Sequence, residues 1–74
     1  MADTNNTKLD LANFPEKLRK ARIAGGWTYE SFAEEIGVSP RIVYDYESGV
    51  KHPRLETLVS IANALRVTVD SLLR

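Results

Sequence analysis

The sequence has no cysteine, a single histidine and no catalytic motif. Without cysteine, disulfides, thiolate ligands and thiol chemistry are excluded. His52 has no second histidine with which to build a metal site or an acid–base relay. A glycine-rich phosphate loop and a nucleophile motif are also missing. We therefore predict that the protein is not an enzyme and uses no metal, cofactor or small-molecule substrate.

An overall charge and a membrane signal are missing as well. Ten Lys and Arg residues balance ten Asp and Glu residues, so any polyanionic partner has to be met by a local basic patch. No stretch approaches the roughly 18 apolar residues of a membrane span. The opening MADTNNTKLD lacks the apolar core of a signal peptide. These features predict a cytoplasmic protein with no membrane partner.

What the chain does contain is enough for one small domain. Its 74 residues are 43% hydrophobic, and a chain of this size buries only about 60% of its unfolded surface. The core therefore has to be efficiently packed, which favours helices. Residues 1–12 are polar and predict a flexible arm, so the folded domain is expected over residues 13–74.

Capping residues and glycines divide this domain into five predicted helices. Asn13, Thr28, Ser39 and Thr68 are of the types that cap helix N-termini. Glycines follow each of the first three apolar segments, where they favour helix ends. The longest apolar stripe at helical spacing consists of Leu55, Leu58, Ile61, Ala62 and Leu65. The predicted helices cover residues 13–25, 28–37, 39–49, 55–65 and 68–73.

The segment 28–49 combines the residues that a steep crossing of two short helices requires. Ala33 is small enough for close approach, and Gly37 tolerates the positive φ of a tight turn. Val38 and Val43 are placed to fill the angle between the helices. Phe32, Ile36 and Tyr46 fall on the same inward side. This is the spacing of a helix-turn-helix motif.

Three segments carry a family resemblance: LRKAR at 18–22, FAEEIGVSPRIVYDYESG at 32–49 and PRLETLVSIANALRVTVDSLL at 53–73. With them the chain resembles the lambda-repressor-like helix-turn-helix domains, which include Cro-type and xenobiotic-response-element-type regulators. The resemblance implies an all-α, compact five-helix domain of bacterial or phage origin. It also implies double-stranded DNA as partner, usually a palindromic operator bound by a dimer, and transcriptional regulation, here as a repressor.

The family's base-reading positions fall on the third predicted helix. The Arg41 fork suits guanine O6 and N7, and Asp45 suits cytosine N4. The alternative is that Arg41 and Asp45, four residues apart, form an ordinary surface ion pair. The sequence favours DNA contact for Arg41 and leaves Asp45 open. The implied base contacts are Ser39, Pro40, Arg41, Tyr44 and Asp45.

The family's phosphate contacts map to the start of the second predicted helix and the loop before the fourth. A solvated loop is the alternative for this basic run. Tyr29 departs from the family, because relatives often have Gln there to bond a phosphate or base edge. A phenol still donates to phosphate but reaches differently. The implied phosphate contacts are Thr28, Tyr29, Lys51, His52 and Arg54.

Further predictions concern packing. Arg22 and Glu47 lie four residues beyond Leu18 and Val43 on inward stripes, and the resemblance places an ion pair there. Trp27 is expected as a partly buried plug between the first two helices. The resemblance also suggests a dimer contact near the chain end, although its apolar residues, Leu72 and Leu73 above all, are alternatively part of the core. The suggested contact residues are Arg66, Val67, Val69, Ser71 and Arg74.

A different function remains open on the same fold. A protein-binding module of antitoxin or anti-repressor type would use helix faces instead of reading DNA, and zero net charge is compatible with it. A binder of RNA or single strands would need aromatic platforms or repeated basic runs, which the sequence lacks. The acidic residues Glu30, Glu34 and Glu35 are expected to form a solvated face.

Overall fold

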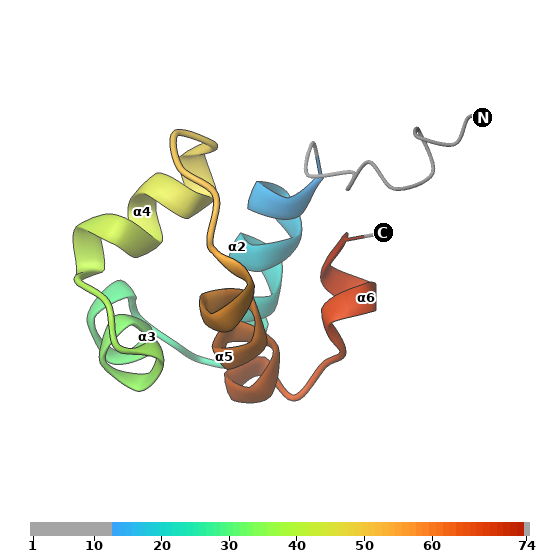
Figure 1. The fold of residues 1–74 in the computed structure, drawn as a ribbon. Helices are drawn as coiled ribbons and strands as arrows, with labels where there is room; N and C mark the ends of the chain where they lie inside the picture. Colours follow the sequence, from blue (N-terminus) through green and yellow to red (C-terminus); the bar gives the residue numbers. More distant parts are fainter. Residues whose placement is uncertain (1–12, 74) are drawn as a thin grey trace.

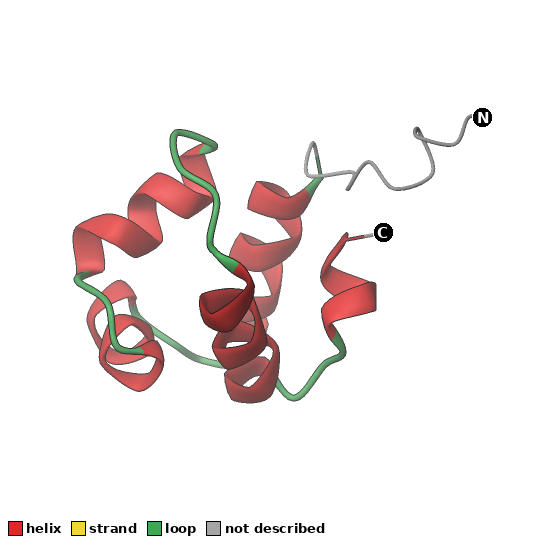
Figure 2. Cartoon of the chain, viewed as in Figure 1, coloured by secondary structure: helices red, strands yellow, loops and turns green. Residues whose placement is uncertain are grey.

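The computed structural model describes residues 13–73, and over this range the protein consists of five helices without a strand (Figures 1 and 2). This confirms the all-α prediction. The segment 1–12, predicted as an arm, and Arg74 lie outside the described residues. None of the described helices has the length and apolar character needed to cross a membrane. The helices are α2 Phe14–Ala24, α3 Tyr29–Ile36, α4 Pro40–Ser48, α5 Leu55–Leu65 and α6 Val69–Leu73.

Hydroxyl side chains begin three of these helices as the sequence predicts. At α3, Thr28 Oγ1 accepts from the Ser31 amide and Ser31 Oγ accepts from the Thr28 amide, both at 3.0 Å. Ser39 Oγ accepts from the Ile42 amide at α4, and Thr68 Oγ1 accepts from the Ser71 amide at α6. Each bond is to an amide at the helix start, where N–H groups lack the i−4 carbonyl partner of the helix interior, and the Ile42 amide donates to the Ser39 carbonyl as well.

Asn13 was expected to cap α2 with its side chain, and this is wrong. Asn13 stands at the N-cap position, but its side chain makes no capping hydrogen bond. Its backbone is helical, with φ −97° and ψ −4°, whereas a capping side chain reaches the first amides from an extended backbone. Pro15, in the first turn, has no N–H to satisfy, so α2 begins with one donor fewer to cap.

The core lies where all five helices meet. In Figure 1, α2 and α5 run through the middle, with α3 and α4 on one side and α6 on the other. The largest fully buried side chains are Phe14, Leu18, Phe32, Val43 and Ile61. α6 contacts α2 and α5 and buries Leu72, which settles the alternative for this leucine in favour of the core.

The predicted inward stripe of α5 is wrong at its first residue. Leu55 is 71% exposed, whereas Leu58, one turn later, is buried. Leu55 is the first residue of α5 and directly follows the largely exposed loop after α4. Helical spacing gives the face on which a residue lies but not how far the core extends along the helix.

The turn between α3 and α4 fixes how α4 is presented. Gly37 has φ +80° and ψ 30°, a left-handed conformation that a β-carbon disfavours. Its amide and that of Val38 both donate to the carbonyl of Ala33, at 2.8 and 3.0 Å. Ala33 itself is 1% exposed, so the small side chain predicted for the crossing lies in the packed interior. One side of α4 is thereby held against α3 and α2, and the other faces outward.

Candidate nucleic-acid interface

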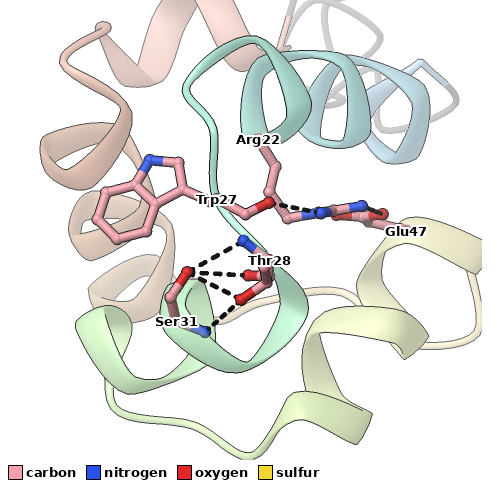
Figure 3. Close-up of polar contacts among 5 residues, drawn as sticks. All are labelled: Arg22, Trp27, Thr28, Ser31 and Glu47. Carbon is pink, nitrogen blue, oxygen red and sulfur yellow. Dashed lines mark hydrogen bonds and ion pairs between the residues drawn. The ribbon is translucent and has the colours of Figure 1, made fainter.

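A buried ion pair joins α2 to α4, as predicted (Figure 3). Arg22 donates from Nε to Glu47 Oε2 at 2.6 Å and from Nη2 to Oε1 at 3.2 Å. Its Nη1 donates to the Trp27 carbonyl at 2.8 Å, so the link between α2 and α3 is held as well. The two side chains are only 10% and 3% exposed. Hydrogen bonding to Glu47 raises the pKa of Arg22 against the opposing effect of burial.

Tyr29 lies between this ion pair and the outer surface of α4. The guanidinium carbon of Arg22 is 4.3 Å from the centre of the Tyr29 ring. On α4, the Tyr44 ring packs edge to face against the Tyr29 ring, with the ring centroids 6.2 Å apart. Sequence reasoning assigned Tyr29 to a phosphate and missed this packing role. The available signal was an aromatic ring at a position where relatives often carry Gln.

Arg41 lies on the outer side of α4 and is held there by Asp45. Arg41 Nε donates to Asp45 Oδ1 at 3.1 Å. The Arg41 side chain is 77% exposed and that of Asp45 only 9%. The guanidinium carbon of Arg41 is also 5.5 Å from the Tyr44 ring centre. Arg41 is therefore an accessible cation whose direction is set by a partner one turn along the same helix.

The geometry argues against Asp45 as a base contact. Its carboxylate is largely buried and accepts from Arg41, so little of it remains for a cytosine amino group. The loop after α4 is tied to the backbone of this residue, because the amides of Val50 and Lys51 donate to the Asp45 carbonyl. The ion pair considered as an alternative in the sequence is present, although one of its members is buried. We assign Asp45 as the residue that positions Arg41.

The remaining predicted base contacts lie beside Arg41. Ser39 and Pro40 are exposed at the start of α4, and Tyr44 is 47% exposed one turn later. Ser39 Oγ accepts the capping bond from Ile42, and its hydroxyl hydrogen is a donor in addition. We call Ser39, Pro40, Arg41 and Tyr44 the reading face.

The predicted phosphate contacts divide into two groups. Lys51, His52 and Arg54 are exposed on the loop that follows α4, and the Lys51 amide is bonded to the end of that helix. All three are on the loop at the C-terminal end of α4, whereas Ser39 and Pro40 lie at the N-terminal end of that helix. Thr28 is exposed, but its hydroxyl already bonds Ser31 in the α3 cap, and Tyr29 is half-buried against Arg22. The loop is thus the stronger part of the predicted phosphate contact.

Two other predicted features lie away from the reading face. Trp27 is partly buried against the core, with its ring edge to face with Phe32 at 5.5 Å, as a plug would be. Near the chain end Val67 is 38% exposed, and Arg66 and Ser71 are exposed too. Val69 and Leu73 are half-buried and pack on the core. The described residues contain no group of three or more acidic, histidine or cysteine side chains able to hold a metal.

Comparison with known proteins identifies the family. The model of a family described as helix-turn-helix matches residues 18–72. The chain belongs to this family. The match covers α3, the Gly37 turn and α4, with the reading face on the second helix of the motif. The family resemblance drawn from the sequence is therefore confirmed.

Individual relatives agree with this assignment. The transcriptional repressor RstR of a cryptic phage in Vibrio cholerae is 42% identical over 57 residues, covering 77% of this chain and 51% of RstR. The transcriptional activator BcrR of Enterococcus faecalis is 38% identical over 60 residues, covering 81% of this chain and 29% of BcrR. The chain thus spans about half or less of these two curated relatives.

A solved structure shares the fold. The clp gene regulator ClgR from Corynebacterium glutamicum superposes with a TM-score of 0.80 at 32% identity. The superposition covers 89% of this chain and 70% of ClgR. The compact five-helix arrangement of α2 to α6 is therefore that of known helix-turn-helix regulators.

Proposed function

We propose that this chain is a sequence-specific double-stranded DNA-binding domain of a transcriptional regulator, acting as a repressor. α4 enters the major groove with the reading face toward the bases. The names of RstR and BcrR, a repressor and an activator of transcription, support the regulatory role, and the higher identity to RstR favours repression. The phage origin of RstR supports a bacterial or phage source and action in the cytoplasm.

The geometry of Arg41 is the single observation that carries the proposal. A guanidinium has five N–H donors, and Asp45 occupies the one on Nε. The four N–H groups on Nη1 and Nη2 remain at the exposed end of the side chain, where they form the fork that grips guanine O6 and N7. A surface arginine without such a partner would lose more rotamer freedom on binding.

Affinity independent of sequence comes from the loop that follows α4. Lys51 and Arg54 are exposed cations on the loop at the C-terminal end of α4, with His52 between them, and cationic contacts neutralise phosphates and release counterions. The chain has no net charge, so this local patch has to supply the electrostatic attraction. Tyr29 adds no phosphate contact in this proposal, because its ring packs against Arg22.

A dimer on a palindromic operator completes the proposal. One α4 reads only about half a turn of major groove, whereas a two-fold dimer spans half-sites about 34–36 Å apart. Exposed Val67 supports the surface predicted near the chain end. It borders an apolar groove of about 470 Å³ that includes Ala24 and Trp27. A second copy that placed its own Val67 against this groove would bury that valine side chain and the apolar lining of the groove.

The second candidate function, a protein-binding module, draws support from a different surface. Leu55 and Val59 are 71% and 41% exposed, and their i, i+4 spacing places them on one side of α5. Val50, on the loop before α5, is also 71% exposed. Neighbouring exposed apolar side chains, such as Leu55 and Val59, are a feature of protein contact sites.

Selection from a random pool of duplexes, followed by mobility-shift measurements at low and moderate salt, separates the two functions. A specific DNA binder enriches one sequence and retains it when non-specific complexes dissociate at moderate salt. A protein-binding module enriches nothing, and all duplexes dissociate together. The second result would overturn the DNA-binding proposal.

A further inference from the structure

We propose that the Tyr44 ring reads the 5-methyl group of thymine in the base pair next to the guanine gripped by Arg41. The inference rests on the proposed function and deepens it, because it names a chemical feature of the operator. Tyr44 and Arg41 are both on the outer side of α4 and are both accessible. The guanidinium carbon of Arg41 lies 5.5 Å from the centre of the Tyr44 ring, so the two side chains form a pair of one cation and one aromatic ring.

The spacing of the two residues matches neighbouring base pairs. They are three residues apart on α4, which corresponds to about 4.5 Å along a helix axis. Successive base pairs are about 3.4 Å apart. With α4 lying along the major groove, Tyr44 faces the pair next to the one that Arg41 reaches, and its ring does not have to share the guanine.

The ring is held in place before DNA arrives. Tyr29 meets it edge to face with ring planes at 83°, and the Arg41 guanidinium lies 5.5 Å from its centre. Tyr29 is in turn covered by Arg22, which donates to Glu47 and Trp27 and so has little freedom to move. A surface held on two sides costs little conformational entropy to order on binding.

The chemistry of the groove decides which base suits such a ring. Among the four bases, thymine alone presents a methyl group in the major groove, and apolar side chains contact it. Cytosine has only a hydrogen at the carbon that bears this methyl, and the hydrogen-bonding groups that adenine, guanine and cytosine present there would be desolvated by an aromatic face without compensation. Tyr44 on α4, backed by Tyr29, therefore selects thymine on either strand of the neighbouring pair.

The test begins with the sequence selected by the wild-type protein from a random pool. Selection with Arg41→Ala identifies the guanine, as the pair where preference is lost, and we expect thymine in an adjacent pair. Uracil is then substituted for that thymine, which removes the methyl and nothing else. We expect about fourfold weaker binding, the equivalent of losing one buried methyl. Uracil in place of a thymine outside the selected site is the matched DNA control and should have no effect.

Two protein variants show whether the ring is responsible. Tyr44→Phe keeps the ring and should keep the fourfold sensitivity to uracil. Tyr44→Ala should bind the thymine and uracil duplexes equally, with thermal unfolding confirming that it is folded. Equal affinity of the wild-type protein for the two duplexes, or selection of a guanine without an adjacent thymine, would overturn this inference and leave the DNA-binding proposal standing. Failure to enrich any sequence would overturn both.

Discussion

Arg22 and Glu47 are the two ends of an ion pair with almost no exposed surface, its shorter bond 2.6 Å from Nε to Oε2. They connect α2 to α4 and are 25 residues apart in sequence. Each of the two buried charges is stabilised by the other, because burying a single unpaired charge costs far more free energy than burying the intact pair. The orientation of α4, which bears the reading face, therefore depends on the buried Arg22–Glu47 pair.

Replacing Glu47 by Ala should destabilise the fold strongly. The change leaves the Arg22 guanidinium buried without its carboxylate partner, with the Trp27 carbonyl and Tyr29 as remaining partners. Loss of one member of a buried pair costs roughly 3–5 kcal/mol, a large part of the stability of a small domain. The denaturation midpoint in urea should fall accordingly. Glu16→Ala is the matched control, since Glu16 pairs with Lys20 at the surface, and equal effects of the two changes would contradict the prediction.

Arg41→Ala should remove sequence preference at one base pair. Loss of a bidentate contact to guanine costs about 1–3 kcal/mol on the selected site and little on random DNA. Competition binding with the selected duplex and with versions altered at each position measures this directly. An equal loss on every duplex would mean that Arg41 contacts phosphate.

Lys51→Ala should behave in the opposite way. It should weaken binding to all sequences and lower the slope of log affinity against log salt by about one unit, because one phosphate contact is lost. A salt titration of wild type and variant on the same duplex gives both slopes. If only the selected duplex were affected, Lys51 would be a base contact instead.

Arg66→Gly should stabilise the domain. Arg66 ends α5 with φ 61° and ψ 41°, and it is the one residue other than glycine with positive φ among those described. Removing the β-carbon relieves the backbone strain of the left-handed conformation, and the greater freedom of glycine in the unfolded chain offsets part of this effect. We expect the free energy of unfolding to rise by about 0.5–1 kcal/mol. Arg66→Ala removes the same charge but keeps the β-carbon. Thermal unfolding of both variants separates the causes, and a gain in the alanine variant as large as in the glycine variant would refute the backbone explanation.

Tyr46 should make stability fall in alkaline solution. Burial raises the pKa of Tyr46, with Thr57 and Arg54 acting in the opposite direction. The folded protein keeps this proton where the unfolded chain, with a pKa of about 10, loses it. The contribution of protonated Tyr46 to the free energy of unfolding is therefore complete below about pH 10. It is lost as the pH rises through the pKa of Tyr46 in the folded protein. Urea unfolding of wild type and Tyr46→Phe should show a difference that shifts in favour of the variant above pH 10; a difference independent of pH would contradict this.

Dimer formation on DNA should depend on Val67. Sedimentation should show a free protein that is mainly monomeric, because so small a chain offers little interface, and two copies on a duplex with two half-sites. Val67→Lys should abolish cooperative binding while leaving the affinity for one half-site unchanged. Ile23→Lys, at another exposed apolar residue, is the matched control. Independent binding to the two half-sites by the wild-type protein, at any spacing, would refute the dimer.

Much of the fold could be predicted from single residues because the relevant signals are local. Thr28, Ser39 and Thr68 begin helices by bonding amides only three residues away. Gly37 ends α3 because the turn requires a positive φ, which glycine adopts without strain. The Arg22–Glu47 pair was the long-range exception, since two inward stripes and a family resemblance both pointed to it.

The candidate site was less predictable because it depends on which way side chains turn in three dimensions. Asp45 falls at a family reading position, yet its side chain is largely buried and its carboxylate accepts from Arg41. Tyr29 is adjacent to Thr28 in sequence, but its partners Arg22 and Tyr44 come from two other helices. Leu55 continues an apolar stripe that the core does not reach. The helical periodicity of apolar residues does not predict these side-chain contacts or the exposure of Leu55.

The Arg41–Asp45 bond lies entirely within one helix, and this has a consequence for how target choice evolves. Two codons determine both the reading group and its support, but Arg41 is exposed whereas Asp45 is buried, as are the core residues Val43 and Tyr46. A paired change at positions 41 and 45 therefore gives the chain a new target only when the new residue at 45 also fits a buried site. Recognition and folding are inherited together at this position of the helix.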